Sequence, residues 1–237
     1  MAEDLKKSFG LTNNALKLIA MASMLADHIG VVLLPQYEIL RIIGRLAFPI
    51  FAYMIAEGCT YTRNRKSYLV KIALLAAGCQ VVYMVVDGSL YQSVLVSFVL
   101  SILTIFAIDA YLRKGDWLSR VKMLAMIACV IFLTVIAPEC FAGSGFEVDY
   151  GLLGVLLPVT VYLAPDKWSK CACVAVMTTL LGAHMGGVQW YGLLAVGLLA
   201  LYNGQRGKWN LKYLFYIFYP GHLGAIYLLD ILLRSIN

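Results

Sequence analysis

Hydrophobic residues in this chain gather in long runs that short polar segments separate. Each run approaches the 20 or so residues that a helix needs to cross a bilayer. Two runs, 150–164 and 188–203, fall below that length, so eight to ten spans are expected and nine fit best. The other seven expected spans are 13–34, 39–60, 67–86, 92–112, 121–138, 169–185 and 211–233.

Composition supports a membrane-embedded chain. Of 237 residues, 62% are apolar and 14% are charged, whereas soluble domains have about 45–50% apolar and about 25% charged residues. A helical bundle satisfies all backbone polar groups inside the bilayer. The sequence therefore predicts an all-α, polytopic bundle that forms a single membrane domain over residues 1–237, with the lipid bilayer as its main partner.

Basic residues predict the orientation of the bundle. All but three of the 19 Lys and Arg residues fall on one side of the nine spans, and the exceptions are Arg41, Arg45 and Arg234. This asymmetry predicts a cytosolic N-terminus and an outer C-terminus. It also explains the net charge of +6 without a nucleic-acid partner. The six cysteines show neither a disulfide framework nor metal-ligand spacing, so no metal site is expected.

Ionisable residues inside the spans are the first functional candidates, because each costs at least about 2.5 kcal/mol to insert. They occur in the first, second and last expected spans: Asp27, His28, Arg41, Arg45, Glu57 and His222. At about 1.5 Å per residue, His28 and Arg45 both lie roughly 21 Å from the inner face. His222 lies about 16 Å from it, so the three residues can meet if the first and last helices are neighbours.

A histidine beside a carboxylate and an arginine suits acyl transfer. The imidazole removes a proton from an attacking amine or hydroxyl, or carries the acyl group, and the guanidinium holds an oxyanion. Pro49 leaves the carbonyl of Arg45 without its helical donor, which opens the backbone at this point. There are simpler alternatives. His28 would only form a hydrogen bond between neighbouring helices, and Arg41 and Arg45 would anchor their helix at the outer surface or neutralise Asp27.

Two basic turns on the expected inner face have the donors that a phosphate-rich cofactor needs. The alternative for each residue is the ordinary cytosolic excess of positive charge. The cofactor-binding candidates in these turns are Arg63, Arg65, Lys66, Asn203, Arg206 and Lys208.

Several motifs in a fixed order make the chain specific. Examples are Asp27-His28-Ile29-Gly30 and Pro220-Gly221-His222, and the full set lies at 27–30, 41–51, 57–58, 149–151, 191–194, 201–207 and 215–223. Together they resemble the TraX family, from about Leu11 to the last helix. Two positions depart from the expected pattern: Gly221 stands where Leu is expected, and Gln189-Trp190 stands where Pro is expected.

The resemblance implies an acetyltransferase that takes acetyl groups from cytosolic acetyl-CoA in the bacterial cytoplasmic membrane. The acceptor would be an amine or hydroxyl at the membrane or outer face, on pilin or another envelope molecule. Mapping the motifs makes Asp27, His28, Arg45 and His222 the expected catalytic residues. Five other motif residues are expected to bind the acceptor: Arg41, Glu57, Asp149, Tyr150 and Tyr219.

Two other classes of function fit the same residues. A small-solute or proton-coupled transporter also has buried His, Arg and Asp beside helix-breaking prolines, although no inverted repeat is visible. A non-catalytic scaffold in an envelope complex would tolerate the loss of His28, Arg45 and His222.

Overall fold

The computed structural model describes residues 10–86, 88, 90–208 and 212–236. Within these residues the chain is helical, with two isolated single-residue bridges. Its contacts define two compact units. Unit 1 contains the described residues up to Met54 and from Pro165 onward, and unit 2 is Ile55–Ala164. Whether they act as the single expected domain stays a prediction, and each unit is described separately.

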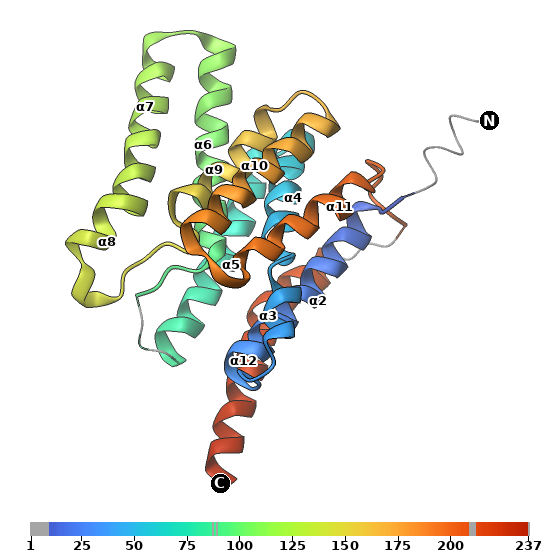
Figure 1. The fold of residues 1–237 in the computed structure, drawn as a ribbon. Helices are drawn as coiled ribbons and strands as arrows, with labels where there is room; N and C mark the ends of the chain where they lie inside the picture. Colours follow the sequence, from blue (N-terminus) through green and yellow to red (C-terminus); the bar gives the residue numbers. More distant parts are fainter. Residues whose placement is uncertain (1–9, 87, 89, 209–211, 237) are drawn as a thin grey trace. The chain divides into compact units, whose positions relative to one another are not determined.

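Unit 1 is built from the two ends of the chain. Its elements are α2 (Asn13–Val32), α3 (Glu38–Gly44), the first half of α4 (Ala47–Tyr61), α10 (Lys167–Met185), the 3-10 helix η3 (Gly187–Leu193), α11 (Leu194–Ala200) and α12 (Lys212–Ile236). Figure 1 shows α12 running beside α2, with α3 on the return from α2. Fully buried aliphatic residues such as Leu16, Ile50 and Leu181 form its core.

Glycines set the close packing of α2 against α3. A Cβ atom at Gly30 would lie 2.9 Å from the Cβ of Leu40, and one at Gly44 would overlap the carboxylate of Asp27. Helices approach this closely only where side chains are absent or small. The two glycines therefore bring the polar residues of α2 and α3 within bonding distance.

A short pairing between the N-terminal segment and the 201–207 turn holds the start of α2. Leu11 forms a parallel bridge with Tyr202, and the backbone N–H groups of Asn13 and Asn14 donate to the carbonyls of Gln205 and Arg206. The Thr12 side chain also accepts from Ala15 N–H. These bonds satisfy the backbone donors that a helix leaves open in its first turn.

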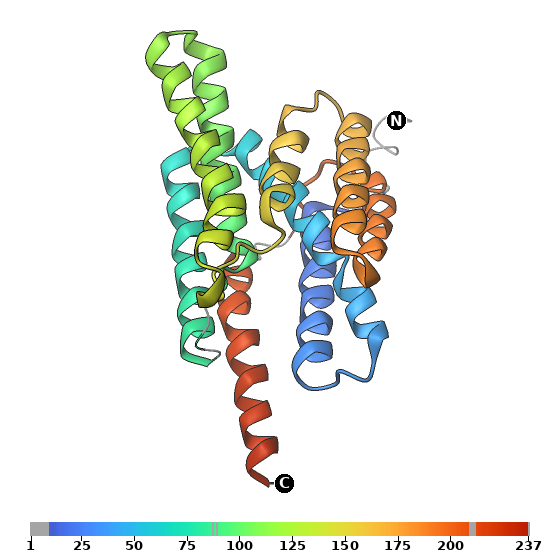
Figure 2. The ribbon, with the colours of Figure 1, turned by 60° about the vertical axis from the view of Figure 1, so that its left-hand side comes forward.

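Unit 2 centres on α6 (Val94–Lys114), which packs against α5 (Arg65–Val86), α7 (Trp117–Ile131) and α9 (Gly151–Leu163). Figure 2 shows α5, α6 and α7 side by side. The hydroxyls of Ser97 and Ser101 donate to the carbonyls of Asp149 and Val155. Small polar residues thus join α6 to α9 and the segment before it, as in other membrane bundles.

Pro138 accounts for the wide turn that follows α7. The π-helix η1 (Phe132–Ile136) and the short α8 (Ala137–Cys140) continue α7, and η2 (Ala142–Ser144) is a 3-10 turn. Proline has no N–H to complete the regular helical ladder, and a π-turn absorbs such an interruption without ending the helix.

The expected spans agree with the helices, and five of them also have the length and apolarity of membrane spans. Those five, among the described residues, are Asn13–Val32, Glu38–Tyr61, Arg65–Val85, Val94–Lys114 and Trp117–Cys140. Gly151–Leu163 and Gly187–Ala200 are shorter apolar helices, as expected for residues 150–164 and 188–203. The number of crossings and the orientation stay predictions.

Candidate functional site

Arg45 lies at a break in the second expected span. That span consists of two helices, α3 and α4, with Arg45 and Leu46 between them. Gly44 is a weak helix former and Pro49 cannot donate to the carbonyl of Arg45, so the ladder is interrupted here. A Cβ at Gly192 would lie 3.5 Å from that carbonyl oxygen. The break therefore exposes a backbone acceptor towards η3 and fixes the start of the Arg45 side chain.

Asp27 forms ion pairs with two arginines, Arg41 within α3 and Arg45 directly after it. Its two carboxylate oxygens accept separately, from Arg41 Nη1 at 2.7 Å and from Arg45 Nη2 at 2.5 Å. Arg45 is only 8% exposed. The simpler expectation that the arginines neutralise Asp27 is therefore met, and the same ion pairs also fix the guanidinium of Arg45 in the interior of unit 1.

Gln189 completes the surroundings of Arg45. Its Oε1 accepts from Arg45 Nη1 at 3.1 Å, and the residue is 3% exposed. The 3-10 helix η3 places it there, packed against α3 and α10. The ring of Trp190 is 2.7 Å from the point where Gly182 would carry a Cβ, so α10 fits closely against the next residue of η3.

The two histidines meet between α2 and α12. The ring centroids of His28 and His222 are 5.0 Å apart in an edge-to-face arrangement. His28 Nδ1 is 2.8 Å from the carbonyl of Met24, and His222 Nδ1 is 2.7 Å from that of Phe218. A carbonyl only accepts, so each Nδ1 carries the hydrogen and each Nε2 has a lone pair. Both imidazoles are thus held as potential bases or nucleophiles.

The carbonyl of Met24, rather than Asp27, orients His28. Consecutive residues of a helix point about 100° apart, so the carboxylate and the imidazole diverge. The carboxylate turns to α3 and the imidazole turns to α12. The sequence pairs these residues as neighbours, but the structure uses them in two different contacts.

Aromatic rings line one side of His222. The ring of Phe218 stacks on it at 4.6 Å, and Tyr219 lies edge-on at 6.3 Å. Tyr219 also contacts Phe51 of α4. His222 is 7% exposed, and its Nε2 is buried with no hydrogen-bond partner among the described residues. The Nε2 atom of His222 is therefore buried beside aromatic rings.

Three of the predicted acceptor-binding residues lie in unit 2 rather than unit 1. Glu57 is buried near the far end of α4. Asp149 accepts from the hydroxyl of Tyr91 at 2.7 Å, and burial followed by the charge of Asp149 raises the pKa of Tyr91. Tyr150 adopts a positive φ of 60° immediately before α9. Such a conformation is rare for a bulky residue.

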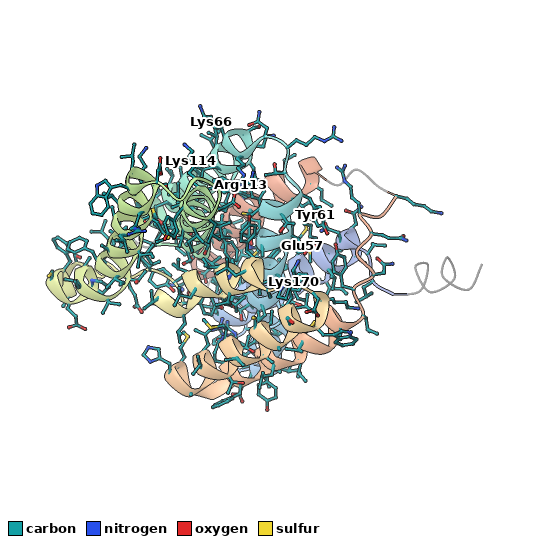
Figure 3. All side chains as sticks on the ribbon, turned by 90° about the horizontal axis from the view of Figure 1, so that it is seen from above. Glu57, Tyr61, Lys66, Arg113, Lys114 and Lys170 are labelled. Carbon is teal, nitrogen blue, oxygen red and sulfur yellow. The ribbon has the colours of Figure 1, made fainter. Side chains whose placement is uncertain are left out.

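Arg65 forms an ion pair that no sequence motif predicts. Asp109 of α6 contacts Arg65 Nη2 at 2.5 Å and Arg113 Nε at 3.0 Å, and the Arg65 guanidinium also lies over the ring of Phe106. Figure 3 shows Lys66, Arg113 and Lys114 on the same side of this unit. An acidic residue inside an apolar span was the available signal for Asp109.

The cofactor-binding candidates in and directly after the 201–207 turn have two different surroundings. Asn203 is used inside the turn, where its side chain donates to the carbonyl of Gly10 and accepts from Gln205 N–H. Arg206 and Lys208 are exposed, and no acidic partner is found for either among the described residues. The turn therefore holds α2 and presents two cations to solvent.

A model of the family described as TraX protein matches residues 12–230. The chain belongs to the TraX family. The match includes every predicted site residue, from Asp27 to His222. Membership agrees with the resemblance seen in the motifs and with an all-helical chain that has several apolar helices.

Two curated relatives of this TraX chain are similar over much of its length. One is the probable fimbrial assembly protein FimC, serogroup H1, of Dichelobacter nodosus, 25% identical over 89% of this chain and 92% of that protein. The other is the uncharacterized protein RP591 of Rickettsia prowazekii, strain Madrid E, 24% identical over 70% of this chain and 62% of that protein. No solved structure matches.

Proposed function

We propose that this chain is a membrane-embedded acetyltransferase that moves an acetyl group from cytosolic acetyl-CoA to an amine or hydroxyl at the membrane or its outer face. The observation that carries the proposal is the histidine pair His28–His222, together with the buried ion pair of Arg45 and Asp27, inside unit 1 of a TraX-family chain. The fimbrial name of one relative favours a pilin N-terminus, or another envelope molecule, as the acceptor.

Proton transfer is the role that the histidine geometry supports. Both Nδ1 atoms donate to backbone carbonyls, so an Nε2 lone pair is available to take the proton of the acceptor. Arg45 would stabilise the negative charge that develops on the acetyl oxygen, and Asp27 would keep the guanidinium in place. If transfer proceeds through a covalent acetyl-enzyme, the Nε2 lone pair of His28 would be the nucleophile.

The CoA phosphates would bind the exposed cations of the expected cytosolic face. In unit 1 these are Arg206 and Lys208, which have no acidic partner among the described residues. Arg63 and Lys66 are similar candidates in unit 2. Arg65 and Asn203 are used in intramolecular contacts, so we assign them mainly to holding the turns that carry these cations.

Binding and transfer are tested together on detergent-purified protein. We expect calorimetry to detect acetyl-CoA binding that weakens at least tenfold in the double variant R206A/K208A. When peptides with a free N-terminal amine are added, the wild type should release CoA thiol from acetyl-CoA. A thiol reagent measures this release. His28→Ala should slow this release at least about 100-fold, as expected for loss of a general base, while acetyl-CoA affinity stays within about threefold.

Three results would count against the proposal. Well-folded protein that does not bind acetyl-CoA would favour the transporter alternative, for which the broken span α3–α4 is a typical feature. Unchanged turnover in His28→Ala would remove the assigned base. Full complementation of a deletion strain by a triple variant lacking His28, Arg45 and His222 would favour the scaffold.

A further inference from the structure

The side-chain amide of Gln189 has a fixed orientation. Arg45 donates to Gln189 Oε1 at 3.1 Å, and a guanidinium has donors only. The amide oxygen must therefore face Arg45, and Nε2 must face the other way. The hydrogen-bond network thus assigns the oxygen and the nitrogen of this amide.

Nε2 of Gln189 is a buried donor without an acceptor among the described residues. Leaving such a group unpaired costs about 1–3 kcal/mol. Gln189 is 3% exposed and its segment η3 packs against α3 and α10, so the amide cannot easily turn to solvent. A donor that is held unpaired beside a buried cation is a binding position for an oxygen atom.

The oxygen that fits this position follows from the proposed function, on which the inference rests. We infer that Gln189 Nε2 donates to the carbonyl oxygen of the acetyl group during transfer, so that Gln189 is a catalytic residue of this chain. Arg45 lies on the other atom of the same amide. The inferred site thus has one neutral donor, Nε2, on an amide whose oxygen is held by a buried cation.

The reaction balances with these groups. The acceptor nitrogen attacks the acetyl carbon while a histidine Nε2 removes one of its protons, and the carbonyl electron pair moves onto the oxygen that accepts from Gln189 Nε2. When that pair returns, the carbon–sulfur bond breaks and the thiolate of CoA leaves. The imidazolium returns the proton to the sulfur, which gives the acetylated amine and free CoA thiol.

Gln189-Trp190 stands where the motif pattern of the family leads us to expect proline. Proline has no side-chain donor, so the pattern alone does not assign this function. Gln189 is absent from the set of residues that the motifs single out.

Two variants separate donation from the positioning of Arg45. Gln189→Glu keeps an oxygen that accepts from Arg45 and removes the Nε2 donor, whereas Gln189→Leu removes both contacts. Loss of one donor to a developing oxyanion typically slows the chemical step about 100- to 1,000-fold. We expect both variants to lower kcat by about that much and to leave the KM for acetyl-CoA within about threefold.

A sulfur-substituted donor supplies a readout that a structural role would not change. In acetyldithio-CoA the carbonyl oxygen is replaced by sulfur, which accepts hydrogen bonds poorly. The ratio of turnover with acetyl-CoA to turnover with acetyldithio-CoA should fall at least tenfold from the wild type to either variant, because the wild type alone has an Nε2 bond to lose. Variants that only distort the site slow both donors equally and leave this ratio unchanged.

The possible outcomes distinguish a failure of the inference from a failure of the proposed function. A wild-type ratio retained in both variants, or wild-type kcat in Gln189→Glu beside slow turnover in Gln189→Leu, would show that Gln189 only positions Arg45 and would overturn the inference alone. No turnover by well-folded wild type would overturn the proposed function, and the inference would fall with it. If Gln189→Leu does not fold, the ratio in Gln189→Glu decides.

Discussion

Asp27 is the residue on which the geometry of the candidate site depends most directly. It is a single carboxylate that contacts two arginines, one of them almost fully buried. Removing one member of a buried ion pair leaves the other charge uncompensated, which is more costly than the net worth of the pair. The position of Arg45, and with it the proposed oxyanion site, depends on this one side chain.

We expect Asp27→Asn to destabilise the chain and to reduce transfer. The amide keeps the shape of the carboxylate but removes the charge that balances Arg41 and Arg45. The free energy of unfolding should fall by up to about 3–5 kcal/mol, which thermal unfolding in detergent would detect as a clear loss of melting temperature. Turnover should fall further than the affinity for acetyl-CoA.

Asp230→Asn is the matched control for that change. It breaks the i,i+4 ion pair with Arg234, whose side chain is 76% exposed. Exposed pairs contribute about 0–1 kcal/mol, so this variant should unfold almost as the wild type does. Equal destabilisation by the two substitutions would mean that the ion pairs of Asp27 have no special weight.

At the scale of elements, the contact between α2 and α3 depends on the absence of side chains at a few positions. Gly44 is the clearest case, because its missing Cβ leaves the space that the carboxylate of Asp27 occupies. From there Asp27 reaches the arginines before and after Gly44 in the sequence. A glycine that is unfavourable for helix formation is thus placed where two helices need to come closest.

Gly44→Ala should separate α2 from α3 and weaken the ion pairs of Asp27. Alanine is the better helix former by about 1 kcal/mol, so a loss of stability would have to come from packing. Gly78→Ala on α5 is the control, since nothing lies within 4 Å of a Cβ added there. Thermal unfolding should show a lower melting temperature for the first variant and an equal or higher one for the second; the reverse order would contradict this packing.

For the whole molecule, the orientation in the membrane is the property that most needs measurement. The positive-inside pattern predicts that the segment around Cys140 faces outward and that the 201–207 turn faces the cytosol. Cys140 is exposed, and so is Lys208. Both positions are therefore suited to chemical labelling.

In a background without the other five cysteines, Cys140 should react with a membrane-impermeant maleimide added to intact cells. A second protein, with Cys140 also replaced and Lys208→Cys introduced, should react only after the membrane is permeabilised. Labelling is followed by the mass shift on a gel. Reaction of both positions in intact cells, or the opposite order, would refute the predicted orientation.

The sequence anticipated many elements because their causes are local. Apolar runs of sufficient length are read directly from the chain, and expected spans such as 13–34 and 92–112 agree with α2 and α6 within two residues. The second span was predicted as one helix. It is broken at Arg45 and Leu46. Gly44 and Pro49 weaken the helix here, and the break also needs another segment, here η3, that packs against the opened backbone.

The helical class, the membrane character and the family motifs are all read from the chain alone, because hydrophobicity and residue order are properties of the sequence. Which polar groups meet depends on the packing of helices that are distant in the sequence. This packing brings His222 to His28 and Gln189 to Arg45 across long stretches of sequence, and it pairs Arg65 with Asp109. Such contacts arise when glycines and aromatic rings fix the distances between helices, which no spacing along one helix can specify.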